Sequence, residues 1–273
     1  MATVYLQPGS GTGAGTLADP YYYSEIYDAH NAATSTGTVD GVVILTDGDY
    51  ESSTNKIIGN MVPSSAVTIE FKALNAHQAS FKSTNTTSCV SLELGTSASQ
   101  SFTVKLTDIK LENYSLYCKG PAEINRIRMF VSGVANHGNG FFRGPDSILF
   151  NECEFYWGAV GSNVTIFNRA NNATMNGCTL FFDLASGSTA SNTGVPPSTF
   201  KNTIISSNNG SAFTSDLFGS SGMTNCCLHN VFVTSASSGT TDCIDGDPQF
   251  VDSTTGDLRL RPSSPCINAG TVS

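Results

Sequence analysis

Two glutamates with i, i+2 spacing, Glu152 and Glu154, are the best-placed pair of carboxyl groups in this sequence. Alternate side chains of a β-strand point to the same face, so both carboxyl groups are expected on the outer face of one strand. Glycoside hydrolysis needs two carboxyl groups roughly 5–9.5 Å apart across the sugar, and this spacing is compatible with that chemistry. Acidic residues that alternate along a strand more commonly serve only to solvate it, and we favour that interpretation.

Two further residues of interest, both aromatic, lie just beyond Phe155. Tyr156 continues the expected outer face, and Trp157 is the only tryptophan of the chain. Aromatic rings stack on sugars, so Glu152, Glu154, Tyr156 and Trp157 form our candidate strip for glycan contact. Packing at a corner of the fold, or at a subunit interface, is the more common role of such rings.

The densest group of carboxylates lies further along, at Asp242, Asp245, Asp247 and Asp252. Calcium prefers oxygen ligands from aspartates, backbone carbonyls and water, and turns of this kind supply several of them. The segment lacks the loop of an EF-hand, and aspartates that cap turns explain the pattern at least as well. We therefore expect no cofactor, with calcium as the weak alternative.

A repeat of strands and corners must position these residues. Asn151, Asn176, Asn202 and Asn225 each precede a strand core, at spacings of 25, 26 and 23 residues, and Ile109 and Met129 extend the series. A repeat of this length with Gly, Ser and Asn corners is typical of a solenoid.

Strand alternation orients each repeat. It predicts an inward-facing Cys153 and Cys178, which act as small hydrophobic side chains, and a ladder of stacked asparagines. In the third repeat, Phe200, Asn202 and Ile204 are expected to share one face.

Both ends of the chain carry recognisable patterns. Asp247-Pro248-Gln249-Phe250 begins a short apolar segment, Leu258 and Leu260 alternate with Arg259 and Arg261, and a loop with Pro265 ends on Gly270. This ending resembles the last coil and cap of right-handed parallel β-helix proteins, the pectate-lyase-like group. Near the start, Tyr22, Ile26 and Ala29 have helical spacing, and the buried strand 41–50 follows; this order resembles the N-terminal cap of the same group.

The resemblance implies an all-β, single-domain, right-handed parallel β-helix (a solenoid) with an N-terminal capping helix. Residues 1–40 are expected to form the N-terminal cap, residues 41–246 the coils, and residues 247–273 the last coil and C-terminal cap.

The enzymes of this group have catalytic motifs that the chain does not reproduce. The segment 136–140 around His137 and the segment 126–128 ending at Arg128 loosely resemble two hydrolase motifs, but they occur in the reverse order, and no Asp-Asp pair is present. A polysaccharide lyase or glycoside hydrolase remains the alternative function. Glu152, Glu154, His137 and Arg128 would then have to carry the reaction.

The composition limits the classes of partner that this chain is expected to bind. The net charge of −9, with 13 basic residues that form no stripe, argues against nucleic-acid binding. No apolar run approaches the length of a membrane span, so no membrane insertion is expected. The eight cysteines show no CxxC spacing, which argues against zinc. The adjacent Cys226 and Cys227 must point to opposite faces of a strand, so one of them is expected to be exposed.

These observations predict a non-enzymatic structural or binding protein of a bacteriophage virion: a capsid decoration, a fibre or a tailspike-like component. The first residues show no secretion signal, which fits synthesis in the host cytoplasm and release by lysis; an extracellular protein is the alternative. Its expected partners are other virion proteins and surface polysaccharides. A homotrimer is an option that no heptad run enforces.

Overall fold

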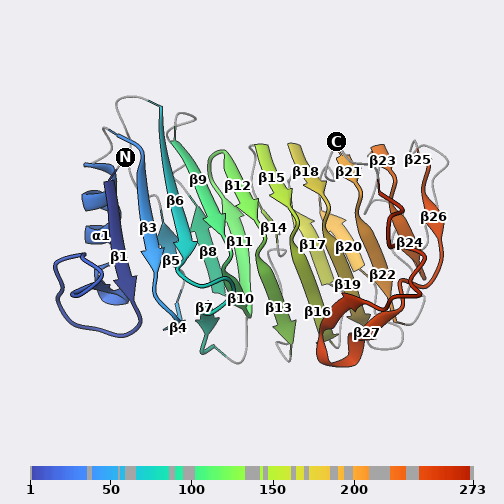
Figure 1. The fold of residues 1–273 in the computed structure, drawn as a ribbon, viewed down its shortest axis with the longest axis horizontal. Coiled ribbons are helices and arrows are strands. Elements are labelled where there is room, and N and C mark those ends of the chain that lie inside the picture. Colours follow the sequence, from blue (N-terminus) through green and yellow to red (C-terminus); the bar gives the residue numbers. More distant parts are fainter. Residues whose placement is uncertain are drawn as a thin grey trace.

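The structure is a computed structural model of the chain, and it describes residues 2–35, 39–54, 56–58, 66–85, 90–94, 102–132, 142–143, 147–160, 164–168, 172–184, 190–193, 199–208, 222–231 and 240–270. These residues form an all-β structure with one short α-helix near the N-terminus. The strands stack side by side along the long axis of the molecule in long parallel sheets (Figure 1).

Sheet A forms one side of the stack. In spatial order its described strands are β2 (Tyr21–Tyr22), β1 (Ala2–Gln7), β3 (Gly41–Leu45), β6 (Val67–Ala73), β9 (Phe102–Thr107), β12 (Ala122–Asn125), β15 (Ser147–Asn151), β18 (Asn172–Asn176), β21 (Thr199–Lys201), β23 (Gly222–Thr224) and β25 (Thr240–Thr241).

Sheet B carries the candidate site on its outer face. Its described strands, again in spatial order, are β4 (Gly48–Ser52), β7 (Ala79–Ser83), β10 (Lys110–Glu112), β13 (Arg128–Ser132), β16 (Glu154–Val160), β19 (Thr179–Leu184), β22 (Ile204–Ser207), β24 (Cys227–His229) and β26 (Ile244–Asp245).

Sheet C completes the stack. It contains β5 (Lys56–Ile58), β8 (Val90–Leu94), β11 (Tyr114–Cys118), β14 (Phe142–Arg143), β17 (Val164–Asn168) and β20 (Ala190–Thr193) within the described part of the chain. From β3 to β20 the chain visits sheets A, B and C in turn, and each strand from β3 to β19 pairs in parallel with the strand three places later. This order is the stacked, solenoid-like arrangement that the repeat predicts.

From β9 onwards, a tight corner joins each described sheet A strand to its sheet B strand. The first residue of each of these corners has a positive φ, and its amide continues the ladder: Glu152 N donates to Asn176 O at 2.9 Å, and Gly177 N donates to Lys201 O at 3.0 Å. Gly, Asn and Asp tolerate this left-handed conformation better than other residues. The equivalent corner residues are Asp108, Arg126, Glu152, Gly177, Asn202, Asn225 and Asp242.

The register corrects part of the predicted repeat. Asn151 pairs with Asn176, and Asn176 pairs with Lys201, so Asn202 occupies the corner position one residue later. Asn202 therefore does not share a face with Phe200; the inward residues of that coil are Phe200, Thr203 and Ile205. Likewise Lys110 pairs with Arg128, which makes Ile109 equivalent to Ile127 rather than to Met129. An asparagine contact between coils is present where Asn151 Nδ2 donates to Asn125 Oδ1 at 2.9 Å, although Asn125 was not part of the predicted series.

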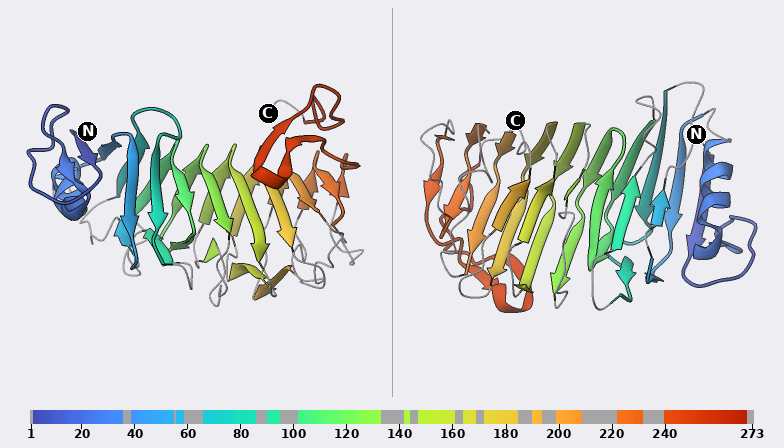
Figure 2. Two further views of the ribbon diagram at one scale, coloured as in Figure 1. Left: turned by 90° about the horizontal axis from the view of Figure 1, so that it is seen from below. Right: turned by 180° about the vertical axis from the view of Figure 1, so that it is seen from behind.

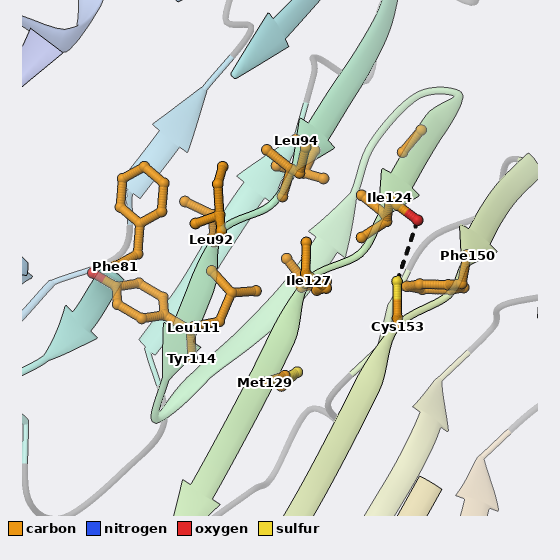
Figure 3. Close-up of a cluster of buried hydrophobic side chains, with 14 of the residues drawn as sticks. Phe81, Leu92, Leu94, Leu111, Tyr114, Ile124, Ile127, Met129, Phe150 and Cys153 are labelled. Carbon is orange, nitrogen blue, oxygen red and sulfur yellow. Dashed lines mark hydrogen bonds between the residues drawn. The ribbon is translucent and has the colours of Figure 1, made fainter. Parts of the chain in front are cut away.

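Apolar side chains from the three sheets fill the interior (Figure 3). Cys153 and Cys178 are each 1% exposed, which confirms the predicted inward orientation. The Cys153 thiol donates to Ile124 O at 3.3 Å, and burial raises its pKa well above the ordinary value. With Cys226 and Cys243 of later coils, these residues form a column of inward thiols in the position that follows the corner, and Thr203 interrupts the column between Cys178 and Cys226.

The N-terminal residues cover one end of the stack, as expected. Strand β1 pairs with β3, and the helix α1 (Ile26–Thr34), preceded by the 3₁₀ turn η1 (Tyr23–Glu25), packs on both strands. Ile26 and Ala29 are buried as predicted, but Tyr22 lies before the helix, and the buried aromatic residue of this cap is Tyr23. No helix in the described segments is both long and apolar enough to span a membrane.

The C-terminal residues do not form a further coil. Strands β27 (Phe250–Asp252) and β28 (Asp257–Leu260), with the 3₁₀ turn η2 (Ser253–Thr255) between them, form an antiparallel hairpin. The hairpin lies outside the stack, against sheet B (Figure 2, left). The alternation at 258–261 was therefore correctly assigned to a strand, but that strand pairs within the hairpin. We call residues 250–260 the C-terminal hairpin.

Candidate functional site

The outer face of sheet B presents two rows of side chains that run across neighbouring coils. In the first row Lys110, Arg128 and Glu154 are register partners; in the second row Glu112, Phe130 and Tyr156 are partners. Strand alternation produces both rows, because the residues between them, such as Leu111 and Phe155, point into the core.

Aromatic packing attaches the C-terminal hairpin to this face. The rings of Phe130 and Tyr156 stack with centroids 4.6 Å apart, and Tyr156 stacks on Phe181 at 5.8 Å. Phe250 meets Phe181 edge to face at 5.6 Å, and Leu258 is buried in the same cluster. The hairpin thus shields a small apolar surface that is separate from the main core.

A groove of about 730 Å³ remains between the hairpin and sheet B. Its walls come from three strands of the sheet on one side and from the hairpin on the other. The lining residues are Lys110, Glu112, Arg128, Met129, Phe130, Glu154, Tyr156, Thr255, Gly256, Asp257, Leu258 and Arg259.

The charges in the groove are paired. Arg128 Nε lies 2.9 Å from Glu154 Oε2, and Lys110 Nζ lies 3.0 Å from Glu112 Oε1. On the hairpin, Arg259 Nη2 lies 2.6 Å from Asp257 Oδ2. The hydrogen bonds from Arg259 lower the pKa of Asp257 to about 2, and the charge of Arg128 contributes to this shift. The two ion pairs Arg128–Glu154 and Asp257–Arg259 therefore face each other across the groove.

This arrangement suits the binding of a polar ligand better than acid catalysis. The cations are well exposed: the side chain of Arg259 is 71% accessible and that of Arg128 is 46% accessible. Acid catalysis of glycoside cleavage requires a protonated carboxyl group, which enzymes obtain by placing it in apolar surroundings. The carboxylates of this groove lie beside cations instead.

A second groove, of about 490 Å³, lies on the other side of the hairpin. Ser206 Oγ and His229 Nδ1 are 3.1 Å apart there, and Arg261, Asp247 and Gln249 line the same groove. Ser206 and His229 are register partners on neighbouring strands, so their contact follows from the pairing of β22 with β24.

The predicted glycan strip is divided by the fold. Glu154 and Arg128 line the groove with partly exposed side chains. Tyr156 also lines it, but it is only 5% exposed and its ring stacks on Phe130 and Phe181, so it offers no open face to a sugar. Glu152 is an exposed corner residue with φ 54°, so it does not share a strand with Glu154 as the spacing had suggested.

The prediction for Trp157 is wrong. Its side chain is fully buried, and its ring stacks on Phe182 with centroids 4.6 Å apart, so it offers no face to a sugar. Alternation within β16 is the reason: an outward Tyr156 requires an inward Trp157. His137 lies outside the described residues.

The four aspartates proposed for calcium do not converge. Asp247 accepts a hydrogen bond from Gln249 N at 2.8 Å, and Asp252 accepts one from Thr254 N at 3.1 Å, so both cap turns. Asp242 is a corner residue, and Asp245 lies on β26. Among the described residues no group of three or more His, Cys, Asp or Glu side chains is arranged to hold a metal ion.

Several groove residues were missed by sequence reasoning. Lys110, Glu112 and Phe130 lie on strands whose register is visible only when Ile109 is aligned with Ile127. Asp257 and Arg259 belong to the hairpin, which the sequence analysis placed in the last coil. The signal available was the alternation of polar and apolar residues in 110–112; residues 128–130 do not alternate, because Phe130 is apolar.

Comparisons of the chain with protein-family models, with curated proteins and with solved structures find no match.

Proposed function

We propose that this chain is a non-enzymatic binding protein that holds a surface polysaccharide in the groove between sheet B and the C-terminal hairpin. The same proposal takes the stacked sheets to be a right-handed parallel β-helix of the pectate-lyase-like group. The long parallel sheets, and the one α-helix that the described residues contain near the N-terminus, support this finer description.

The observation that carries the proposal is the groove itself. It combines three exposed cations and three carboxylates with the half-buried ring of Phe130. Sugars are recognised by hydrogen bonds to charged and polar groups and by contact with aromatic surface. Because most of these side chains stand on hydrogen-bonded strands, they are held in place before a ligand arrives, which lowers the entropic cost of binding.

The biological setting we propose is a bacteriophage virion, where the chain would act as a capsid decoration, a fibre or a tailspike-like component beside other virion proteins. The elongated stack offers a long lateral surface for such neighbours (Figure 2, right). Only 13% of the residues are charged, and the sequence is rich in Ser, Thr, Asn and Gly. To test this setting, virus particles are sedimented from a lysate and probed with an antibody to the chain.

Binding to a panel of neutral and uronic-acid-containing polysaccharides, measured by isothermal titration calorimetry, tests the groove. We expect Arg128→Gln to weaken the binding of a captured polysaccharide by about tenfold, because it removes a charge-assisted hydrogen bond. Arg143→Gln is the matched control: Arg143 lies on sheet C, with its guanidinium 4.5 Å above the ring of Tyr117. Equal loss in both variants, or no binding by the wild type, would contradict the proposal.

A second candidate function is a polysaccharide lyase or glycoside hydrolase. The observation in its favour is that Glu112, Glu154 and Asp257 line one groove together with Arg128. Hydrolysis would need two of these carboxyl groups, and elimination would need a base such as the arginine. Product analysis separates this function from binding alone.

A further inference from the structure

Cys227 is buried although it points away from the core. Alternation places Cys226 inside the stack, 1% exposed, and Cys227 outside it, yet Cys227 is only 3% exposed. The sequence had predicted an exposed cysteine here. The reason for the difference is that residues 261–270, which follow the hairpin, run back across this part of the stack (Figure 1).

The covering segment brings a second thiol to the first. Cys227 and Cys266 line one small cavity of about 70 Å³, together with Asn202 and Gly270. A Cβ at Gly270 would lie 3.2 Å from Asn202 Oδ1, so the segment is closely seated on the corner at this point. The Cys227 thiol also approaches Gly246 O at 3.4 Å.

The two thiols differ in reactivity. A hydrogen bond from Cys227, aided by Ser264, holds the pKa of Cys266 below its ordinary value. The same contact with Cys266, together with burial, raises the pKa of Cys227. Cys266 is also the more accessible of the two, being half-buried. A thiolate that is accessible is the species that attacks a disulfide.

We propose that Cys227 and Cys266 are a disulfide-exchange site that reversibly fastens the C-terminal segment to the stack. The co-reactant is a small-molecule disulfide. The Cys266 thiolate attacks one of its sulfurs and releases one thiolate, which leaves a mixed disulfide on Cys266. Cys227 then loses its proton to solvent and attacks the Cys266 sulfur, which releases the second thiolate. The chain loses two hydrogens, and the co-reactant is reduced to two thiols.

This disulfide would restrict the movement of the hairpin that forms one wall of each groove. Cys266 lies six residues beyond Leu260, the last residue of β28, so a link at Cys266 limits how far the hairpin can move from sheet B. The hairpin forms one wall of both grooves. Oxidation is therefore expected to hold the hairpin against sheet B, so that it remains a wall of both grooves. Reduction is expected to allow the hairpin to move away and the grooves to open.

The inward thiol column supplies a matched control. Cys243 is half-buried, like Cys266, but its thiol donates to the backbone of Met223 at 3.7 Å, inside the stack. Cys226, Cys227 and Cys243 lie on one tryptic peptide, residues 202–259, whereas Cys266 lies beyond Arg259. A disulfide between these two peptides therefore reports a bond to Cys266, and variants identify its partner.

The experiment equilibrates the full chain with oxidised and reduced glutathione and maps its peptides without reduction. We expect the cross-linked pair of peptides in the wild type and in Cys243→Ser, and its loss in Cys227→Ser and Cys266→Ser. Hydrogen exchange should show the hairpin amides opening at least about tenfold more slowly in the oxidised wild type than in Cys266→Ser.

Two results would overturn the proposal. One is a cross-link that persists in Cys227→Ser; the other is a wild type that stays fully reduced in oxidised glutathione while circular dichroism shows it folded. If the more buried Cys227→Ser fails to fold, fragmentation of the cross-linked wild-type peptides identifies the partner of Cys266 directly, and a bond to Cys226 or Cys243 would overturn the proposal. The assay contains no saccharide, so its outcome is independent of ligand binding in the groove.

Discussion

Gly256, at the tip of the C-terminal hairpin, lies directly against the ring of Phe130 on sheet B. A Cβ at Gly256 would be 2.9 Å from Cε2 of Phe130 and 3.6 Å from Cδ2 of Tyr156. The backbone of Gly256 also has a φ of +79°, which side chains other than glycine rarely adopt. The hairpin can therefore approach sheet B this closely only with glycine at its tip.

Gly256→Ala is expected to loosen the hairpin. The new methyl group meets the Phe130 ring and adds backbone strain, for a combined cost of about 1–3 kcal/mol to hairpin docking. Faster hydrogen exchange of the β28 amides, with coil amides unchanged, is the expected signature. Gly222→Ala is the control, because no atom lies within 4 Å of its would-be Cβ. Unchanged exchange in Gly256→Ala would show that the ring can move aside.

The N-terminal cap is expected to lose stability in mild acid through His30. Its side chain is 2% exposed, and burial lowers its pKa from 6.5 to about 4. Between these two pH values the unfolded chain binds a proton that the folded chain does not. Stability is therefore fully present above about pH 6.5 and falls as the pH approaches 4, by at most about 3 kcal/mol.

Urea unfolding of the wild type and of His30→Gln at pH 7.5 and pH 5 measures this effect. Glutamine cannot be protonated in this range, so the variant should show a smaller loss between the two pH values. The same loss in both proteins would assign the acid sensitivity to other groups.

Trp157 is expected to report on the core and not on the groove. Trp157→Ala should destabilise the fold by about 3–5 kcal/mol, because it removes a buried ring that stacks on Phe182. Trp157→Phe should cost less and leave any ligand affinity unchanged. Tryptophan fluorescence should shift on unfolding but not on binding a saccharide. A ligand-induced shift in a folded sample would place the ligand elsewhere.

Removal of residues 1–40 is expected to cause aggregation. The truncation uncovers the edge of β3, which β1 occupies in parallel register, and the apolar surface beneath Ile26 and Ala29. Exposed strand edges and an open core favour association between chains. Size-exclusion chromatography and light scattering test this. A folded, monodisperse truncation would mean that α1 and β1 are not a required cap.

The repeat and its orientation could be predicted from the sequence, because stacked coils place like residues above like. Cys153 and Cys178 show this. Ile26 and Ala29 of the capping helix could be predicted for a different reason, the helical spacing of apolar residues. The exact register could not be predicted at Asn202. Asparagine suits both the last strand position, as at Asn151, and the left-handed corner one residue later.

The candidate site was harder to predict, since it depends on contacts between distant segments. Alternation at 258–261 describes a strand but not its partner, so the hairpin and a further coil look the same in sequence. Tyr156 and Trp157 are both aromatic, but as neighbours in one strand they point to opposite faces of the sheet, Tyr156 outward and Trp157 into the core. Cys227 is a further example. The sequence allowed its outward orientation to be inferred, but it did not show that residues 261–270 would pack over it.

Glu154 and Glu152 provide the decisive comparison between binding and catalysis. Glu154 lines the groove in an ion pair with Arg128, whereas Glu152 stands at a corner, off the strand that carries Glu154. For a binding protein, Glu154→Gln should weaken saccharide affinity by about three- to tenfold through loss of a charged acceptor, and Glu152→Gln should leave it unchanged. The wild type should release no reducing ends and no unsaturated products from acidic polysaccharides, with or without calcium. Hydrolysis requires a proton donor and a second carboxylate, and elimination requires a base and a charge-stabilising cation. Sustained turnover by the wild type that Glu154→Gln abolishes, and that Glu152→Gln preserves, would establish the groove as an active site instead.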